Sequence, residues 1–436
     1  MRLLRIWLRT VTITLVCLVA LAGYLARRVL AGRSTAEARE RLRGESLSRL
    51  LERLGATFIK FGQILSTRPD LLGPGYIEPL ARLQDSVPPA PFEAIEAMLA
   101  RELSPRERAR IVTLEPMPIA AASVAQVHRG VLDDERVVAV KAQRPEVEAQ
   151  VDRDLSILSF GARLLDRIPT VRMLSLPGSV ARFAVALRGQ LDFRAEADNN
   201  RRFAKNFSGV PNVGVPGLVD DLCTRRVLVM DFIEGVKATE PEKVGGDRAA
   251  LARVGGETVL KMVFHDGFVH ADLHPGNIIL TPDGRVVLID LGMVTDIPGE
   301  LLRPWVETFL ALAQQDSARV AELFYVYAPS VATPDYAAYQ RDVEENLAGL
   351  YGKKLGEVEI SEAVSSMMNV LRKHRVQVDP TFTVVNIALL VAEGLGKQLD
   401  PTIDLMPMAM PYLSEAMLTA PPGRAPLREL PAAVAG

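Results

Sequence analysis

The sequence predicts an α+β fold, because short strand-like runs lie among long stretches with the spacing of amphipathic helices. Residues 127–141 hold two apolar runs with an Asp-Asp turn between them, which is typical of a β-hairpin. Residues 278–289 hold two more, and the Thr-Pro-Asp-Gly sequence between these favours a second hairpin. Residues 300–415 have a helical pattern almost throughout. The C-terminal part of the chain is therefore predicted to be rich in helix.

Length and composition place the chain among globular proteins with room for more than one domain. Its 436 residues are 48% hydrophobic and 24% charged, so a large core is expected and disorder is not the default. The net charge of −2 gives no general argument for binding nucleic acid. Cys17 and Cys223 lack metal-ligand spacing, and a disulfide between them is not expected. A reducing, cytosolic setting is predicted for the main body.

The segment 267–292 carries the most specific functional pattern in the sequence. Asp272 and Asn277 lie where the second hairpin is entered, and Asp290 lies where it is left, 18 residues after Asp272. A kinase-type phosphotransfer site needs this set: one Asp to orient the attacking hydroxyl, and an Asn and a second Asp to hold Mg²⁺ on the phosphates. Oxygen atoms of this kind are the ligands that Mg²⁺ prefers.

Two other interpretations of this segment stay open. The Asp-Leu-Gly sequence that begins at Asp290 is, taken alone, most often a structural turn. His270, Asp272 and His274 share one face of an extended segment, and two imidazoles with a carboxylate would suit zinc. A zinc site would leave Asn277 and Asp290 without a role, so the combined pattern favours the magnesium interpretation.

The first 34 residues are predicted to form a membrane anchor. Residues 10–26 carry no charge, and as a helix they would extend roughly 25 Å, slightly less than a bilayer core of about 30 Å. Flanking arginines can close that difference. More arginines follow this stretch than precede it, which favours keeping the body in the cytoplasm. A cleaved signal peptide is the alternative, because Ala20-Leu-Ala22 has the form of a cleavage site.

Residues 35–110 are predicted to be a helical extension. Leucines recur at helical spacing up to Leu54. A Pro-rich linker at 86–91 then leads into a further amphipathic helix over 92–110.

The helix that follows Gly55 carries two polar residues of interest. Pro69 ends its pattern, and Lys60 and Gln63 lie three residues apart, so both can face one site. On composition alone, a solvated Lys and Gln are the simpler interpretation. The apolar face of this helix consists of Phe58, Phe61, Ile64 and Leu65.

The Ala-rich run 119–126 lies before the strands of residues 127–141, where a kinase would carry its glycine-rich phosphate loop. Alanine lets a phosphate come close, although it lacks the easy access of glycine to positive φ. Such runs are usually packing, so this segment depends on support from the rest of the site. The residues predicted to line a nucleotide here are Ala121, Ala122, Ser123 and Gln126.

Lys141 ends an apolar strand, where an ammonium group is costly to bury unless it meets an anion. Phosphate oxygens and a helix Glu are the kinase solution. Asp192 and Glu196 lie four residues apart on one predicted helix face, and Glu196 is the expected partner. The alternative, a Lys that emerges into solvent at a strand end, stays open.

The segment 226–235 is predicted to be a buried strand that ends at a glycine, which is the form of a hinge between two lobes. Met230 and Phe232 are the residues predicted to contact an adenine there. Residues 247–265 are predicted to be a helix that leads back to the catalytic segment.

Beyond Asp290 the helical pattern resumes near Gly299, and no Ala-Pro-Glu-like segment closes a long activation loop. A groove for an extended protein substrate is therefore expected to be missing. The apolar run 384–392 is too short to cross a membrane and is predicted to be core. The Pro- and Ala-rich tail from Ala420 is expected to be loose.

With these motifs placed, the chain from about residue 45 to residue 415 resembles the UbiB/AarF family of ADCK-like atypical kinases. The matching motifs are Lys60-Phe-Gly-Gln63 (the K-x-G-Q signature), Ala120-Ala-Ala-Ser123 (the Ala-rich loop), Val138-Ala-Val-Lys141, Glu196, His270-Ala-Asp272 with Asn277, and Asp290-Leu-Gly292. A later segment, Glu393-Gly-Leu-Gly-Lys-Gln-Leu-Asp400, is similar to the family as well.

The resemblance implies a two-lobed, protein-kinase-like fold with a helix-rich C-lobe and an N-terminal helical extension. Its K-x-G-Q helix would cover the site that protein kinases keep open for a protein substrate. The resemblance further implies binding of ATP or ADP with Mg²⁺, ATPase rather than protein kinase behaviour, and a link to the biosynthesis of ubiquinone or related isoprenoid quinones.

Two features depart from the family pattern. Its E-x-D motif is Gln190-Leu-Asp192 here, so Lys60 keeps only Asp192 as a carboxylate partner in a regulatory extension formed with Gln63. Many bacterial relatives carry hydrophobic spans at the C-terminus, whereas the candidate in this chain lies at the N-terminus.

The sequence thus predicts a membrane-anchored, kinase-fold ATPase or small-molecule kinase. Lys141 and Glu196 would position the phosphates, Asn277 and Asp290 would bind Mg²⁺, and Asp272 would orient the attacking oxygen. Expected partners are membrane lipids or isoprenoid quinone precursors and other quinone-biosynthesis proteins, without nucleic acid; a homodimer is left open. The alternative is a non-catalytic, nucleotide-gated scaffold that presents quinone-lipid precursors. The predicted domains are an anchor (1–34), a helical extension (35–110), an N-lobe (111–236), a C-lobe (237–415) and a flexible tail (416–436).

Overall fold

The computed structural model describes residues 2–30, 32, 35–66, 72–83, 88–167, 176–333, 335–351 and 360–431. These residues form two compact units. Unit 1 contains the described chain up to Ser66, together with Leu72–Asn200 and Pro216–Phe232. Unit 2 contains Arg201–Val215 and the described chain from Ile233 onward.

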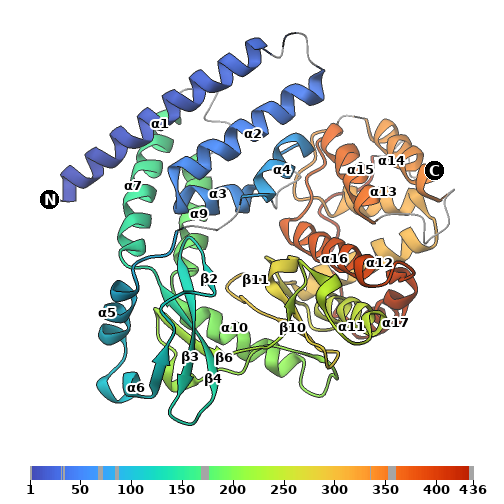
Figure 1. The fold of residues 1–436 in the computed structure, drawn as a ribbon. Coiled ribbons are helices and arrows are strands. Elements are labelled where there is room, and N and C mark those ends of the chain that lie inside the picture. Colours follow the sequence, from blue (N-terminus) through green and yellow to red (C-terminus); the bar gives the residue numbers. More distant parts are fainter. Residues whose placement is uncertain are drawn as a thin grey trace. The chain divides into compact units, whose positions relative to one another are not determined.

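Unit 1 contains an antiparallel sheet (Figure 1). The order along it is β1-β3-β4-β6, with β2 paired to β3, and the predicted hairpin at 127–141 is confirmed as β3 and β4. Glu135 adopts a left-handed φ of 66° in the turn between them. The strands are β1 (Ile111–Leu114), β2 (Ala120–Ala121), β3 (Ala125–Leu132), β4 (Val137–Gln143) and β6 (Val227–Asp231).

The two faces of this sheet pack against different helices, because successive side chains of a strand point to opposite faces. One face, with Val138 and Val140, packs against the helix that contains Ile95 and Leu99. The other face, with Ala139, packs against the helices that follow β4. The helices that begin in unit 1 are α1 (Arg2–Leu30), α2 (Ala36–Leu54), α3 (Ala56–Ser66), α4 (Pro74–Ala81), α5 (Phe92–Glu102), α6 (Pro105–Ala109), α7 (Val147–Leu165), α9 (Leu176–Gly189) and α10 (Phe193–Asn206), with a short 3-10 turn at Asp220–Leu222.

The single helix predicted over 92–110 is wrong, since α5 ends at Glu102 and α6 begins at Pro105. Ser104 caps α6: its side chain accepts the Glu107 backbone N–H, and the Glu107 carboxylate accepts the Ser104 N–H. This reciprocal capping box starts a new helix in the middle of the amphipathic pattern.

Unit 2 holds two small sheets. One has the order β5-β10-β9-β7, in which the predicted hairpin at 278–289 is confirmed as antiparallel β9 and β10. The other pairs β8 with β11. The strands are β5 (Val213–Gly214), β7 (Val236–Lys237), β8 (Phe268–His270), β9 (Ile278–Leu280), β10 (Val286–Leu288) and β11 (Val294–Asp296).

Helices make up most of the rest of unit 2. The helix predicted over 247–265 appears as α11, followed by a π-helical turn at Lys261–His265. The helices are α11 (Arg248–Leu260), α12 (Gly299–Ala313), α13 (Ser317–Val326), α14 (Tyr336–Tyr351), α15 (Ile360–Lys373), α16 (Pro380–Leu399) and α17 (Leu405–Thr419), with 3-10 turns at Pro241–Lys243 and Pro275–Asn277.

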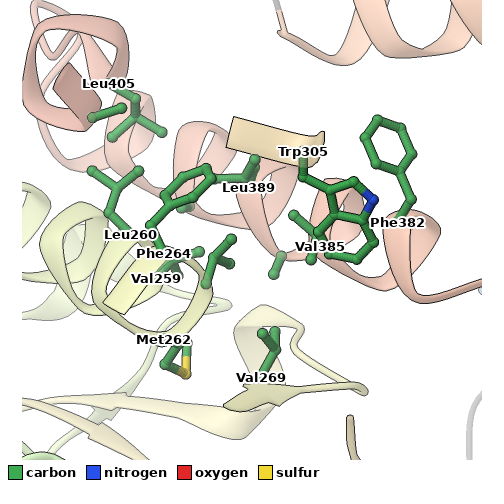
Figure 2. Close-up of a cluster of buried hydrophobic side chains, with 14 of the residues drawn as sticks. Val259, Leu260, Met262, Phe264, Val269, Trp305, Phe382, Val385, Leu389 and Leu405 are labelled. Carbon is green, nitrogen blue, oxygen red and sulfur yellow. The ribbon is translucent and has the colours of Figure 1, made fainter. Parts of the chain in front are cut away.

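The apolar run 384–392 lies in the core of unit 2, as the sequence predicts. In Figure 2, Val385 and Leu389 of α16 lie among side chains from α11, the π-helical turn and α12. Length and composition make Thr381–Leu399 one of two described helices that could span a membrane, but 61% of it is buried in the protein. The second, Ile6–Leu30 of α1, is not buried.

The chain after α17 differs from the loose tail that the sequence predicts. Residues 420–431 have no regular secondary structure, yet they lie against α12 and α13. The Leu427 backbone N–H donates to Val326 O at 2.8 Å, and the guanidinium groups of Arg424 and Arg428 donate to the carbonyls of Tyr327 and Ala328. These bonds hold the described part of the tail on unit 2.

Candidate active site

Lys141 and Glu196 form a buried ion pair within unit 1. The Lys141 Nζ donates to both carboxylate oxygens of Glu196, at 2.8 and 2.9 Å, and the side chains are only 12% and 7% exposed. Glu196 lies in the first turn of α10, where the helix dipole favours a negative charge. Strand alternation places Lys141 on the sheet face toward α10, and its Nζ lies 5.5 Å from the centre of the Phe193 ring.

The Ala-rich segment folds as a tight hairpin between β2 and β3. Ala121 pairs with Gln126, and the Ala122 N–H donates to Ala125 O at 2.8 Å, so Ser123 lies at the turn and is buried. Arg144 holds this turn from outside: its backbone N–H donates to Val124 O, and its guanidinium reaches the carbonyls of Ala122 and Pro88. A backbone turn therefore stands where a nucleotide phosphate loop is expected.

Gln126 has a packing role instead of the predicted nucleotide contact. It pairs with Ala142 across the strands, so its side chain projects to the sheet face opposite to that of Lys141. The amide is 1% exposed; its Oε1 accepts the Ala90 N–H at 2.8 Å, and its Nε2 lies 2.8 Å from His128 Nε2. Gln126 thus ties the linker before α5 to the sheet.

The predicted hinge residues lie at the end of β6. Met230 is buried opposite Ala139, on the same face as Lys141. Phe232 donates its backbone N–H to Val137 O and packs partly against the same cluster. The structure therefore places both residues at the face of the sheet that carries Lys141 and packs against α7, α9 and α10.

In unit 2, His270 organises the segment around Asp272. His270 ends β8 and is almost fully buried; its Nδ1 accepts the Asp272 backbone N–H at 3.1 Å. The proton of the neutral ring is therefore assigned to Nε2, which faces Ile289 O at 3.4 Å. Burial lowers the pKa of His270 and keeps the ring neutral, with Asp272 and Asp290 acting in the opposite direction.

Asn277 and Asp290 are brought to this same corner by the hairpin. Asn277 is buried at the end of the 3-10 turn, its Nδ2 donates to Asp272 O at 3.1 Å, and its carbonyl accepts the Ile289 N–H at 2.9 Å. Asp290 follows with a left-handed φ of 56°, which few residues other than Gly, Asn and Asp adopt easily. The left-handed backbone at this turn therefore restricts which residue types position 290 can hold.

The oxygen atoms available as metal ligands in this segment suit Mg²⁺. The Asn277 amide nitrogen is already used, so its Oδ1 is the atom that would face a cation, and the Asp290 carboxylate would be the second ligand. The zinc alternative has no support: both ring nitrogens of His270 are engaged, and His274 Nδ1 accepts the Gly276 N–H. Within the described ranges, no group of three or more His, Cys, Asp or Glu residues is arranged to hold a metal.

The K-x-G-Q residues lie on α3 in unit 1. A Cβ on Gly62 would lie 2.2 Å from Leu83 Cδ1 and 2.8 Å from Leu51 Cδ1, so glycine permits the close packing of α3 on its neighbours. Gln63 Nε2 donates to Leu83 O at 3.0 Å, which ties α3 to the end of α4. Lys60 lies on the same helix, two residues before Gly62 and three before Gln63.

Asp192 precedes α10 and pairs with Arg194 at 2.6 Å, and this pairing lowers the Asp192 pKa. The structure therefore gives Asp192 a contact that the sequence interpretation missed. Arg144 and the organising role of His270 were also missed. The position of Arg144, directly after the strand that carries Lys141, was the one available signal.

The structure thus brings Lys141 to Glu196 within unit 1, and Asp272, Asn277 and Asp290 together within unit 2. A strand Lys paired with a helix Glu, together with an Asp, an Asn and a second Asp around a hairpin, defines the kinase-like class. The comparisons with known proteins agree. The profile of the ABC1 atypical kinase-like domain matches residues 82–324, and that of the UbiB helical domain matches residues 343–404.

The chain belongs to the ABC1 atypical kinase-like family, in its UbiB group. It is 32% identical over 388 residues to the "Probable protein kinase UbiB" of Shewanella woodyi, covering 87% of this chain and 71% of the relative. The protein of the same name in Shewanella piezotolerans is 31% identical over the same shares. The resemblance predicted from the motifs is confirmed.

The fold agrees with a solved structure as well. Rv3197 of Mycobacterium tuberculosis, solved in complex with erythromycin, superposes with a TM-score of 0.52 at 24% identity, over 78% of this chain and 90% of that one. The predicted kinase-like α+β fold with a helical N-terminal extension is therefore confirmed.

Proposed function

We propose that this protein is an atypical kinase-fold ATPase or small-molecule kinase that uses Mg-ATP at a membrane, in the biosynthesis of ubiquinone or a related isoprenoid quinone. One observation carries the catalytic part of this proposal: the His270 ring and the Asn277 side chain bond the backbone of Asp272, and the same ring faces the carbonyl of Ile289, the residue before Asp290. Kinase-type transfer depends mainly on positioning and electrostatics, which a rigid polar corner supplies.

Each residue has a role that follows from its place. Asp290 and Asn277 would hold Mg²⁺, which would supply positive charge to the phosphate oxygens. Lys141, fixed by Glu196, would bind phosphate oxygens. The Asp272 carboxylate would orient the attacking oxygen of water or of a small-molecule hydroxyl, while the neutral His270 holds the Asp272 backbone.

Quinone biosynthesis and membrane association rest on the family and on α1. The relatives are named UbiB, and the motifs of this chain resemble the same family. The family resemblance is what links this chain to isoprenoid quinones. The apolar, unburied α1 would hold the body at the cytoplasmic side of the membrane. Lipids and quinone precursors are the proposed partners, with quinone-biosynthesis proteins and a second copy of the chain as further candidates.

A nucleotide-gated scaffold is the second candidate. The hairpin turn at Ala122 and Ser123, held by Arg144, favours it, because alanine limits the backbone conformations available for wrapping a phosphate. ATP turnover by purified protein, with and without liposomes and a phenolic lipid, separates the two. An ATPase releases phosphate in amounts that exceed the protein, whereas a scaffold binds Mg-ATP without turnover.

A further inference from the structure

The outer face of α1 is an apolar ridge that runs from one end of the helix to the other. Each of its residues lies three or four positions from another of them, so they share one broad side of the helix, with the exposed Leu21 and Leu30 beyond its edges. Each of them is more than a third exposed. The α1 ridge consists of Leu4, Trp7, Leu8, Val11, Leu15, Leu18, Val19, Leu25 and Val29.

The opposite face of α1 contacts the neighbouring helices of unit 1 (Figure 1 shows α1 beside α2). Arg9 donates to both oxygens of the fully buried Asp154 carboxylate on α7, at 2.7 and 2.9 Å, and to Leu54 O at 2.6 Å. Ile13 and Val16 pack against the cluster that contains Leu54.

Toward the far end of α1, the Arg43 side chain of α2 lies close enough to Tyr24 to lower the pKa of its hydroxyl. The helix is therefore fixed through Arg9 and runs beside α2, with its ridge facing away from the rest of unit 1.

This docked position is incompatible with crossing a bilayer. The part of α1 between Arg9 and Tyr24 lies alongside the part of α2 between Leu54 and Arg43, which carries several charged side chains. Charged groups are costly in the hydrocarbon core, so α2 cannot follow α1 into it. To span alone, α1 would have to release Arg9 and leave the buried Asp154 carboxylate without its cation.

The charge of α1 indicates which surface covers the ridge. The helix carries five arginines and no acidic residue, and Trp7 is an aromatic residue of the kind enriched at membrane interfaces. An apolar face with basic residues at both ends suits the boundary between the headgroups and acyl chains of anionic lipids. On α7, the helix that Arg9 contacts, Phe160 and Leu164 are exposed too.

We propose that the α1 ridge lies in the plane of an anionic phospholipid surface, and that α1 stays docked on α2 and α7 rather than crossing the bilayer. The inference deepens the membrane association in the proposed function and rests on it. It replaces the single spanning anchor that the sequence predicts with an in-plane contact.

Flotation of the full chain with phosphatidylglycerol–phosphatidylcholine vesicles tests the surface. Wild type should float with these vesicles and bind pure phosphatidylcholine vesicles more weakly. The double variant L15E/L18E should weaken binding by about 100-fold, from the loss of two buried leucines. The matched control is M117E, because Met117 is a 77% exposed apolar residue elsewhere in unit 1. Equal binding of wild type and L15E/L18E overturns the proposal.

Tryptophan depth measurements test the orientation. Quenching by lipids brominated near the headgroup or near the chain end should give the same shallow depth for native Trp7, for W7F/L15W and for W7F/L25W. Trp305 is buried in the core of unit 2 and supplies a constant background. If L15W lies deepest while the ends of the helix lie shallow, α1 spans the bilayer and the in-plane orientation is wrong.

Two further results separate this inference from the catalytic proposal. Vesicle binding without any ATP turnover refutes the ATPase and leaves the in-plane helix standing. ATP turnover without vesicle binding, or a dimer that L15E/L18E dissociates in the absence of vesicles, leaves the enzyme standing and overturns the membrane surface.

Discussion

The Lys141 ammonium is held by both oxygens of the Glu196 carboxylate, and neither side chain is more than 12% exposed. Removing one partner leaves a buried charge, whereas removing both leaves none. K141M should therefore lose about 3–5 kcal/mol of stability. The double variant K141M/E196L should recover most of that loss, as measured by urea unfolding.

Nucleotide affinity should behave differently from stability in these variants. If Lys141 contacts phosphate, both K141M and K141M/E196L should bind Mg-ATP more weakly by roughly 10-fold or more, since each lacks the ammonium group. Isothermal titration measures this. Normal affinity in the refolded double variant would restrict the pair to a structural role.

Asp290→Asn should abolish Mg²⁺-dependent nucleotide binding with little effect on the fold. Asp290 has a φ of 56°, and asparagine tolerates this left-handed backbone as well as aspartate does, so the substitution removes mainly the charge. Nucleotide titrations with and without Mg²⁺ check the result. Asp283→Asn, in the exposed turn of the same hairpin, is the control and should bind as wild type. Unchanged Mg²⁺ dependence in D290N would remove the metal assignment.

The Arg9–Asp154 ion pair should contribute far more to the free energy of unfolding than the Arg188–Asp152 ion pair, which uses a neighbouring carboxylate on α7. Asp154 is fully buried, so R9A should cost about 3–5 kcal/mol of stability. Asp152 pairs with Arg188 at 3.0 Å, but both side chains are about half exposed, so R188A should cost about 1 kcal/mol or less. Similar losses in the two variants would show that α1 is not docked through Arg9.

The residue types and strand positions of the site could be read from the sequence, because spacing around a turn and alternation along a strand are local properties. Lys141 at a strand end and the Asp272, Asn277 and Asp290 set are examples. The side chain of Gln126 could not be placed from the sequence. The register between β3 and β4 pairs it with Ala142, and this pairing puts it on the sheet face opposite to that of Lys141.

Long-range contacts explain the remaining differences. The Arg9 contact with Asp154 joins residues 145 positions apart, and no local pattern in the apolar α1 sequence indicates it. The sequence therefore favoured a free spanning helix where the structure has a docked one. The neutral hydrogen-bonding role of His270 likewise depends on Ile289, which the hairpin brings back to it.

His270 should make the protein less stable in mild acid. Its pKa is lowered from 6.5 by burial, so the folded state keeps the ring neutral while the unfolded state takes up a proton. The stabilisation is complete above about pH 6.5 and declines as the pH falls below that value, by at most about 1.4 kcal/mol per pH unit. Urea unfolding at pH 7.5 and pH 5.5, in EDTA, should show a smaller decline in H270Q, whose amide can accept and donate hydrogen bonds without titrating. If H270Q declines as steeply as wild type, the acid sensitivity arises elsewhere and the ring is not held neutral by burial.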